Sequence, residues 1–372
     1  MPAQPMTAPP ASPSAGGSGG SDVVSFRQAA ARHRTRAYTL TFTSSGQTVQ
    51  QVLNRSGYLA AFRCHLTASI VVGTAAVTWT ATGLKENYFP LVSLRSPQGD
   101  YLHSYSLREL IDFQYRMYRS AVQPSANPRY ATWSPTSATT QAIDITFVIP
   151  ISLNLGANFQ TGLLMRQIAN NDFILSFTLA NPADIGSGIG TLVVTSTATA
   201  ALPATLVIEE EWYELVNPAK VVPPPLNLIV RHRNQKTGPL VIGDYTQPYS
   251  VGPTLLDGLF RVADGGDTAT ELVLTNVNFT RVLANKQTEI DNQNIRDLQD
   301  QFFRWFGKDA RGGVYLHNYF DDMEGCNETR ARDFINTARA AQLDFIINTA
   351  AAFTTANSYL MMFFRELETL GA

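Results

Sequence analysis

The stretch "AIDITFVIPISLNL", residues 142–155, decides the class of fold. Every odd position from Ile143 to Leu155 is apolar, and the even positions are mostly polar, with Val148 and Pro150 as the exceptions. An alternation with a period of two predicts a β-strand that has one face on a hydrophobic core and the other face near water. Because proline has no backbone N–H to donate, Pro150 predicts a bulge or an edge position in the sheet.

Segments of similar character lie on both sides of this stretch. They are rich in Thr, Val, Ile and aromatic residues and are separated by Gly, Pro, Ser and Asn. One amphipathic helix interrupts each half of the chain. The first, at 105–118, opens with a capping box of Ser106 and Glu109, and the second, at 288–307, is predicted to be capped by Thr288. Many strands with one helix per half favour antiparallel sandwiches over a parallel sheet.

The length of 372 residues leaves room for two sandwich cores. Residues 37–216 and 227–372 share one order of elements: short strands, an amphipathic helix, a long strand and a closing strand. We interpret each part as an eight-stranded antiparallel jelly roll with a helix-bearing insertion. The Pro-rich segment 217–226 is predicted to be a stiff linker between them. The predicted fold is therefore all-β, with two jelly rolls in tandem, and we expect the even face of 144–154 to contact another roll.

Residues 1–36 are predicted to be a flexible N-terminal arm. The first 22 are mostly Pro, Ala, Ser and Gly, which bury too little apolar surface to fold alone. An arginine cluster follows, made of Arg27, Arg32, Arg34 and Arg36. It predicts a short amphipathic helix or an extended arm that contacts phosphates, lipid head groups or a neighbouring subunit, and the alternative is a solvated helix entry.

This order of elements resembles that of the double jelly-roll major capsid proteins of tailless icosahedral viruses, the lineage that includes adenovirus hexon and the tectivirus-type phages. The resemblance covers residues 37–372. It is carried by the helix that precedes the later strands of each roll and by three segments, "GGVYLHNYFDD" (312–322), "RDFINTARAAQLDFIINTA" (332–350) and "SYLMMFFREL" (358–367).

The resemblance implies a structural protein of the virion and not an enzyme. It implies homotrimers of pseudo-hexagonal outline that assemble in the host cytoplasm and pack laterally into an icosahedral shell, often over an internal membrane. The implied partners are further copies of this chain, minor capsid or penton proteins and, through the N-terminal arm, membrane lipid head groups. No specific nucleic acid and no cofactor are implied.

The composition agrees with a protein that hides much of its surface in an assembly. The net charge is −2, and only 16% of the residues are charged, which is a low share for a solvated monomer. The near balance of charges also argues against a dedicated nucleic-acid binder, because neutralising phosphates requires a marked excess of Lys and Arg. The sequence contains no apolar run long enough to predict a membrane-spanning helix.

The histidines and cysteines predict no catalytic or metal site. The five histidines stand in separate segments without the spacing of metal ligands. Cys64 and Cys326 are predicted to be small buried hydrophobic residues. Asp321, Asp322 and Glu324 lie in a predicted loop, where a bound calcium ion is the alternative to a solvated turn, although the ordered spacing of an EF-hand is missing.

The densest group of carboxylates is Glu209–Glu211 with Glu214. We predict it to be a solvated end of a strand. The alternative is a pair of catalytic carboxylates, because tandem jelly rolls also occur in amidases that remove glycans from asparagine. A third hypothesis is a receptor- or sugar-binding spike, which predicts exposed aromatic platforms.

Overall fold

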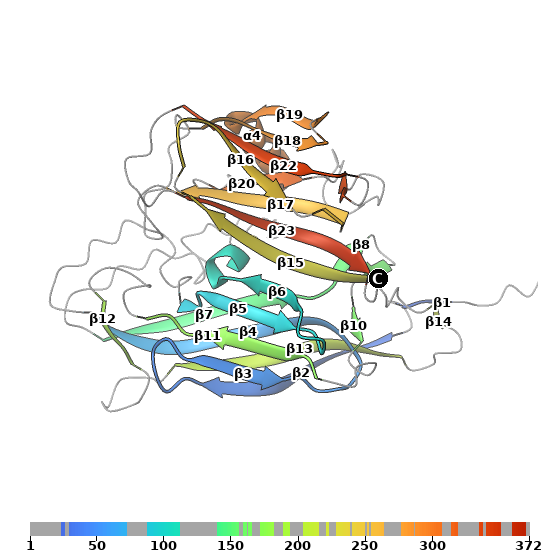
Figure 1. The fold of residues 1–372 in the computed structure, drawn as a ribbon. Helices are drawn as coiled ribbons and strands as arrows, with labels where there is room; N and C mark the ends of the chain where they lie inside the picture. Colours follow the sequence, from blue (N-terminus) through green and yellow to red (C-terminus); the bar gives the residue numbers. More distant parts are fainter. Residues whose placement is uncertain are drawn as a thin grey trace, which may run out of the picture.

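The structure is a computed structural model of the whole chain. It describes residues 24–26, 30–72, 88–111, 140–155, 159–161, 163–165, 172–181, 189–193, 204–215, 221–222, 228–238, 240–249, 251–252, 254–263, 277–285, 287–306, 314–318, 335–337, 340–350 and 359–369. Strands dominate these residues, and Figure 1 shows two stacked units, the first half of the chain below and the second above.

The first unit has eight long strands in two antiparallel sheets. One sheet has the order β2–β13–β4–β7 and the other β3–β11–β5–β6. The strands are β2 (Ala30–Thr41), β3 (Thr48–Val52), β4 (Tyr58–Val72), β5 (Leu91–Arg95), β6 (Tyr101–Tyr105), β7 (Thr140–Pro150), β11 (Ile174–Thr178) and β13 (Thr205–Leu215). Counted along the chain, the two orders are 1-8-3-6 and 2-7-4-5, which is a jelly roll.

The second unit repeats this topology. Its sheets have the orders β15–β23–β17–β20 and β16–β22–β18–β19. The strands are β15 (Leu228–Thr237), β16 (Gly243–Tyr249), β17 (Thr254–Ala263), β18 (Val277–Ala284), β19 (Gln287–Asn294), β20 (Val314–Asn318), β22 (Leu343–Thr349) and β23 (Tyr359–Thr369). The orders are again 1-8-3-6 and 2-7-4-5, so the predicted pair of eight-stranded jelly rolls is confirmed.

Seven shorter strands complete the described structure. They are β1 (Val24–Ser25), β8 (Leu153–Leu155), β9 (Phe159–Thr161), β10 (Leu164–Met165), β12 (Ile189–Val193), β14 (Val221–Val222) and β21 (Ile335–Asn336). The strands β10 and β12 lengthen the first roll by pairing with β4, and β21 pairs with β17. The strands β8 and β9 form a small hairpin of their own.

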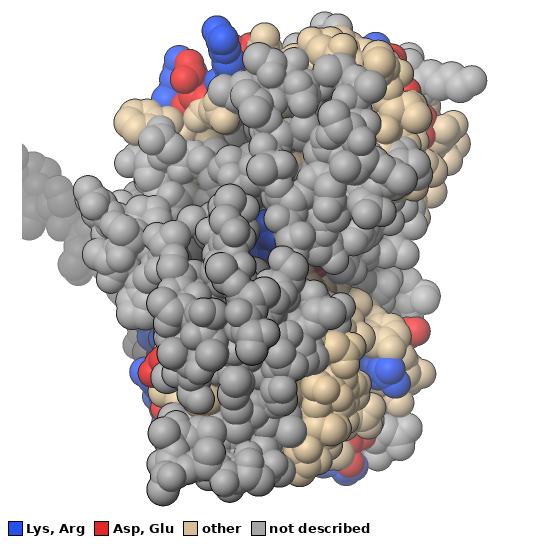
Figure 2. Space-filling model, turned by 90° about the vertical axis from the view of Figure 1, so that its left-hand side faces the viewer, with Lys and Arg blue, Asp and Glu red and all other residues tan. Residues whose placement is uncertain are grey.

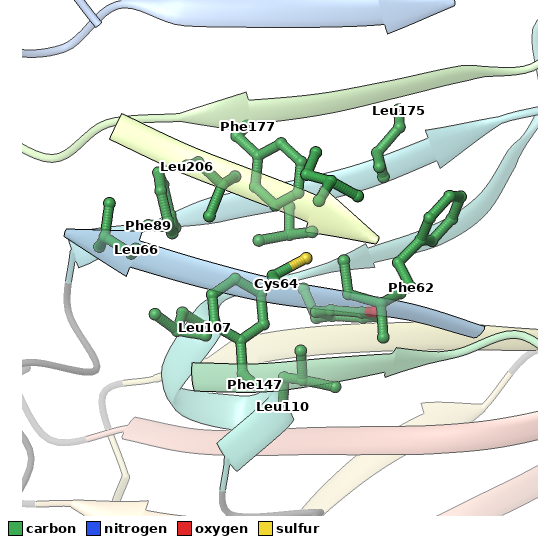
Figure 3. Close-up of a cluster of buried hydrophobic side chains, with 14 of the residues drawn as sticks. Phe62, Cys64, Leu66, Phe89, Leu107, Leu110, Phe147, Leu175, Phe177 and Leu206 are labelled. Carbon is green, nitrogen blue, oxygen red and sulfur yellow. The ribbon is translucent and has the colours of Figure 1, made fainter. Parts of the chain in front are cut away.

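The stretch that predicted the fold class behaves as expected in the first roll. Its odd residues Ile145, Phe147, Ile149 and Ile151 are buried in the core. Figure 3 shows Phe147 of β7 pointing into the same cluster as Cys64 of β4 and residues of β11 and β13. Within the described residues β7 pairs only with β4, so it is an edge strand, as its terminal proline predicts. The even residues Asp144 and Thr146 are exposed in the single chain, and their contact with another roll stays a prediction.

The helix of the first roll begins where the capping box predicts, with residues 107–111 helical. The backbone N–H of Ser106 donates to Glu109 Oε2 at 2.9 Å, and the Glu109 N–H donates to Ser106 Oγ at 3.3 Å. These reciprocal bonds satisfy two amides that the first helical turn leaves without a partner. The predicted continuation to residue 118 lies outside the described residues.

Ser106→Ala is expected to lower the free energy of unfolding by about 1 kcal/mol, because it removes the side-chain half of the capping box. Urea unfolding followed by circular dichroism measures the change. Ser106→Thr keeps an acceptor oxygen and serves as the matched control, which should remain close to the parent. Equal loss in both variants would contradict a capping role.

The predicted start of the second helix is wrong. Thr288 lies in β19, and the helix α4 spans Ile295–Phe306. Its capping residue is Asn294, whose Oδ1 accepts a hydrogen bond from the Arg296 N–H at 2.9 Å. The segment before Ile295 pairs its backbone with β18, and this tertiary pairing overrides the helical spacing read from the sequence.

Two of the predicted segments contain strands. The strand β2 begins at Ala30, so residues 30–36 of the predicted flexible arm belong to the first roll, because β13 offers them a complete ladder of backbone partners. Within the predicted linker 217–226, β14 pairs in parallel with β1. The N-terminal segment thus lies beside the connection between the two rolls, near the C-terminus at the right of Figure 1.

Candidate assembly surfaces

The two rolls share one sheet, and the core of the first roll includes residues of the second. The strands β6 and β15 pair in parallel, with His103 opposite His232, which joins one sheet of each roll into a nine-stranded sheet. Across this joint the ring of Tyr105 lies 5.6 Å from that of Phe363. The first core cluster also includes three residues of the second roll, Leu259, Phe302 and Phe363. The rolls are therefore packed into one block, although the sequence shows two separate periodic halves.

Neighbouring residues of the shared sheet point to opposite sides of it. In β23, Phe363 joins the core of the first roll and Phe364 that of the second. In β17, Leu259 likewise joins the core of the first roll and Phe260 that of the second. The sheet β2–β13–β4–β7 and the sheet β16–β22–β18–β19 consequently lie on opposite sides of the shared sheet, and their outer faces point away from each other.

The outer face of the first roll carries a charged ladder, made of Arg32 and Arg34 in β2, Glu209 and Glu211 in β13, and Arg63 in β4. Glu211 accepts from Arg32 at 2.5 Å and from Arg63 at 3.2 Å, while Glu209 pairs with Arg34. The three strands are adjacent in the sheet. Residues two apart in a strand share a face, so these side chains lie together on the outer face. Each exposed pair is worth about 1 kcal/mol or less.

The prediction of a solvated strand end is wrong for Glu210 and Glu211, although Glu214 is exposed as predicted. Glu210 is 2% exposed and Glu211 8% exposed, in the middle of β13. Glu210 points to the inner side and accepts a hydrogen bond from the hydroxyl of Tyr38 at 2.9 Å. The strand β13 keeps its period of two, so Glu210 shares the inner side with Leu206 and Ile208. The bulges at 208/209 against β2 and at 211/212 against β4 place their extra residues in β2 and β4. A period of two places Glu210 on the inner side correctly, but it does not show that Arg32 and Arg63 cover Glu211 on the outer side.

The predicted arginine cluster does not lie on one arm. Arg32 and Arg34 belong to the charged ladder, Arg36 donates to Thr39 Oγ1 at 3.2 Å, and Arg27 lies outside the described residues. Because Glu209 and Glu211 hold arginines, they make a poor pair of catalytic carboxylates. Their carboxylate oxygens already contact guanidinium groups, so they are not free to contact a substrate.

The opposite outer face, on the second roll, carries a polar network. Asp244 of β16 accepts from Arg281 of β18 at 2.8 Å and from Asn348 of β22 at 2.6 Å. The amide of Asn348 accepts in turn from Asn278 at 2.7 Å. In β22, Asn348 alternates with the core residues Phe345 and Ile347, which places the network on the outside of the sheet.

Both outer faces thus carry groups whose charges are compensated within the same face. Such faces suit contacts between copies of one chain, since neither presents a field that repels a neighbour. Figure 2 looks at one end of the molecule, where described basic and acidic side chains are scattered together and do not form a patch of one sign.

The N-terminal segment is anchored at the edge of the charged face. Phe26 is buried in a small cluster with Ala60, Leu163 and Tyr213. Its ring makes edge-on contacts with Tyr58 at 5.5 Å and with Tyr213 at 5.7 Å. No periodic pattern surrounds Phe26, so the sequence offered no signal for this anchor beyond a lone aromatic residue after a polar arm.

The described residues contain no group of three or more His, Cys, Asp or Glu side chains placed to hold a metal ion. Asp321, Asp322, Glu324 and Cys326 lie outside the described residues. Cys64 is buried as predicted, and burial raises the pKa of its thiol well above the usual value, which leaves it unreactive. Among the helices described, none is long and apolar enough to cross a membrane.

No protein-family model matches this chain, and no curated protein sequence matches it. Solved structures do. The major capsid protein of Sulfolobus turreted icosahedral virus is 13% identical and has a TM-score of 0.67, with 91% of this chain and 97% of that chain covered. The capsid of the virus PBCV-1 gives 11% identity and a TM-score of 0.61 over 91% and 93%. The major capsid protein P2 of bacteriophage PM2 is 11% identical and has a TM-score of 0.56, with 92% of this chain and 98% of that chain covered. The chain shares the double jelly-roll fold of these proteins.

Proposed function

We propose that this chain is the major capsid protein of a tailless icosahedral virus, with a structural and not an enzymatic role in the virion shell. One observation carries the proposal. Two rolls of identical topology are fused through a shared sheet into one block, and solved capsid proteins match this arrangement over nearly the full length of both chains. The engagement of Glu209 and Glu211 by arginines weighs against the alternative of a glycan amidase.

The proposed mode of assembly is a homotrimer closed head to tail. Each chain offers two different outer faces that point in opposite directions, the charged ladder on the first roll and the polar network on the second. A contact between unlike faces is heterologous, and it closes into a ring of three when each contact turns the next copy by a third of a full rotation. Three chains supply six rolls, which gives the pseudo-hexagonal outline that lateral packing in a shell requires.

The remaining partners are part of the same proposal. Trimers would contact each other laterally and meet minor capsid or penton proteins at special positions of the shell. The N-terminal arm with Arg27 would contact a layer beneath the shell, such as the lipid head groups of an internal membrane. Support for this role of the arm is its exit beside β14 and the C-terminus, at one end of the rolls.

Light scattering coupled to size exclusion on the purified full chain is expected to give three times the mass of one chain. Thr146→Trp on the outer face of β7 and Thr246→Trp on that of β16 each place a bulky ring in one of the two faces and should leave monomers. Gln50→Trp, at an exposed position of β3 away from both faces, is the matched control and should still form trimers. A parent chain that stays monomeric under all conditions contradicts the proposal.

A further inference from the structure

We infer that His33, Trp212 and Glu214 form a pH-dependent clamp that holds the beginning of β2, and with it the base of the N-terminal arm, more tightly in acid than at neutral pH. The clamp is formed on the inner side of the sheet, opposite the charged ladder. The use of the arm in assembly rests on the proposed function, whereas the clamp itself is a property of the folded chain.

The geometry of the clamp is well defined. His33 in β2 lies directly opposite Trp212 in β13, and the two rings stack with centroids 4.4 Å apart and planes inclined by 21°. The indole Nε1 of Trp212 donates to Thr35 Oγ1 at 2.9 Å, which fixes the orientation of the indole. Gly57 packs against the indole, since a Cβ there would lie 2.3 Å from Cε3 of Trp212.

The charge of His33 decides the strength of the clamp. Its Nε2 lies 3.2 Å from Glu214 Oε2, and this nitrogen is shielded from solvent without making a hydrogen bond of good geometry. The contact is therefore electrostatic and strong only when the imidazole is protonated. Protonation also adds a cation–π attraction to the stacked indole. Because imidazole gains its charge as the pH falls below neutrality, both contributions grow on the acid side.

The other charged groups around His33 form ion pairs with other residues. Arg32 and Arg34, its neighbours in β2, point to the outer face and pair with Glu211 and Glu209. The loop that packs on Trp212 carries Arg55, whose Nε donates to Asp172 at 2.6 Å. Glu214 is thus the carboxylate of the described residues that contacts His33.

The position of the clamp connects it to the arm. β2 starts at Ala30, opposite Leu215, so His33 lies in the first part of the strand that follows the arm. Before β2 in the sequence, Phe26 and the β1–β14 pair also attach the base of the arm to the folded chain. Loss of the charge on His33 weakens one of these two attachments and leaves the other, which loosens the base of the arm without unfolding the roll.

Hydrogen–deuterium exchange of the purified full chain tests the clamp. After correction for intrinsic rates, the amides of 30–35 should be about fivefold better protected at pH 5.5 than at pH 7.5, as expected for one exposed ion pair with a cation–π contact. His33→Gln should abolish this difference. His65→Gln is the matched control: His65 also contacts a carboxylate, Asp144 at 2.9 Å, but on the outer face of β4, and the difference should persist.

Two results overturn the inference: equal protection of these amides at both pH values in the parent chain, and a pH difference that survives in His33→Gln. Light scattering on the same samples reports trimer formation separately. A chain that never forms trimers but shows the exchange difference contradicts the proposed function and retains the clamp. A trimer without the exchange difference retains the function and removes the clamp.

Discussion

Phe363→Ala is expected to lower the free energy of unfolding by about 3–5 kcal/mol, because the substitution leaves a cavity where the cores of the two rolls meet. Phe363 is fully buried, belongs to the first core although it lies in the second roll, and contacts Tyr105 across the β6–β15 joint. Urea unfolding followed by circular dichroism measures the loss. Since the core of the first roll includes residues of the second, the parent and the variant should each unfold in one transition.

Phe303→Ala is the control for this experiment. Phe303 is a phenylalanine of α4 that is 53% exposed, and its replacement should change the free energy of unfolding by less than about 0.5 kcal/mol. Two separate transitions in Phe363→Ala, with only the second roll destabilised, would show that the rolls fold independently and that the shared core is of little energetic consequence.

Gly57→Ala is expected to cost about 3 kcal/mol or more. Gly57 has a φ of +66°, a conformation in which a side chain is strained, and an added Cβ would lie 2.3 Å from Cε3 of Trp212 and 2.8 Å from the carbonyl oxygen of Tyr213. Relief requires movement of the indole or of β13. Thermal unfolding of the parent and the variant gives the difference, and near-ultraviolet circular dichroism should report a disturbed Trp212.

Gly99→Ala separates strain from crowding. Gly99 has a φ of +95° and no atom within 4 Å of its missing Cβ, so only the backbone term applies, about 1–2 kcal/mol. If Gly57→Ala costs no more than Gly99→Ala, the close approach of Trp212 contributes nothing to the stability of the first roll.

Local patterns in the sequence predicted the parts of the fold that local physics determines. The alternation at 142–155 placed Phe147 and Ile149 in the core, and the capping box at Ser106 marked the start of a helix. Both signals lie within a few residues and need no distant partner. The double jelly roll followed from the order of such signals and from the family resemblance.

The wrong and the missing predictions have a common physical cause: the structure at these residues depends on segments that are distant in the sequence. Thr288 has the chemistry of a helix cap, but pairing with β18 keeps it in a strand. Glu210 and Glu211 are predicted to be solvated until their partners Tyr38, Arg32 and Arg63 are known. The joint between β6 and β15 lies between residues more than a hundred positions apart and leaves no mark in either segment.

The shared nine-stranded sheet has a consequence for the geometry of a closed shell. A chain with a flexible hinge between its halves can adapt to curvature by bending, but a sheet that continues from β5 and β6 into β15 and β23, with Phe363 packed into the first core, resists bending between the rolls. We therefore expect the two rolls to move as one rigid body. In the proposed capsid, the curvature then arises at the contacts between copies of the chain, and the angles at these contacts set the size of the particle.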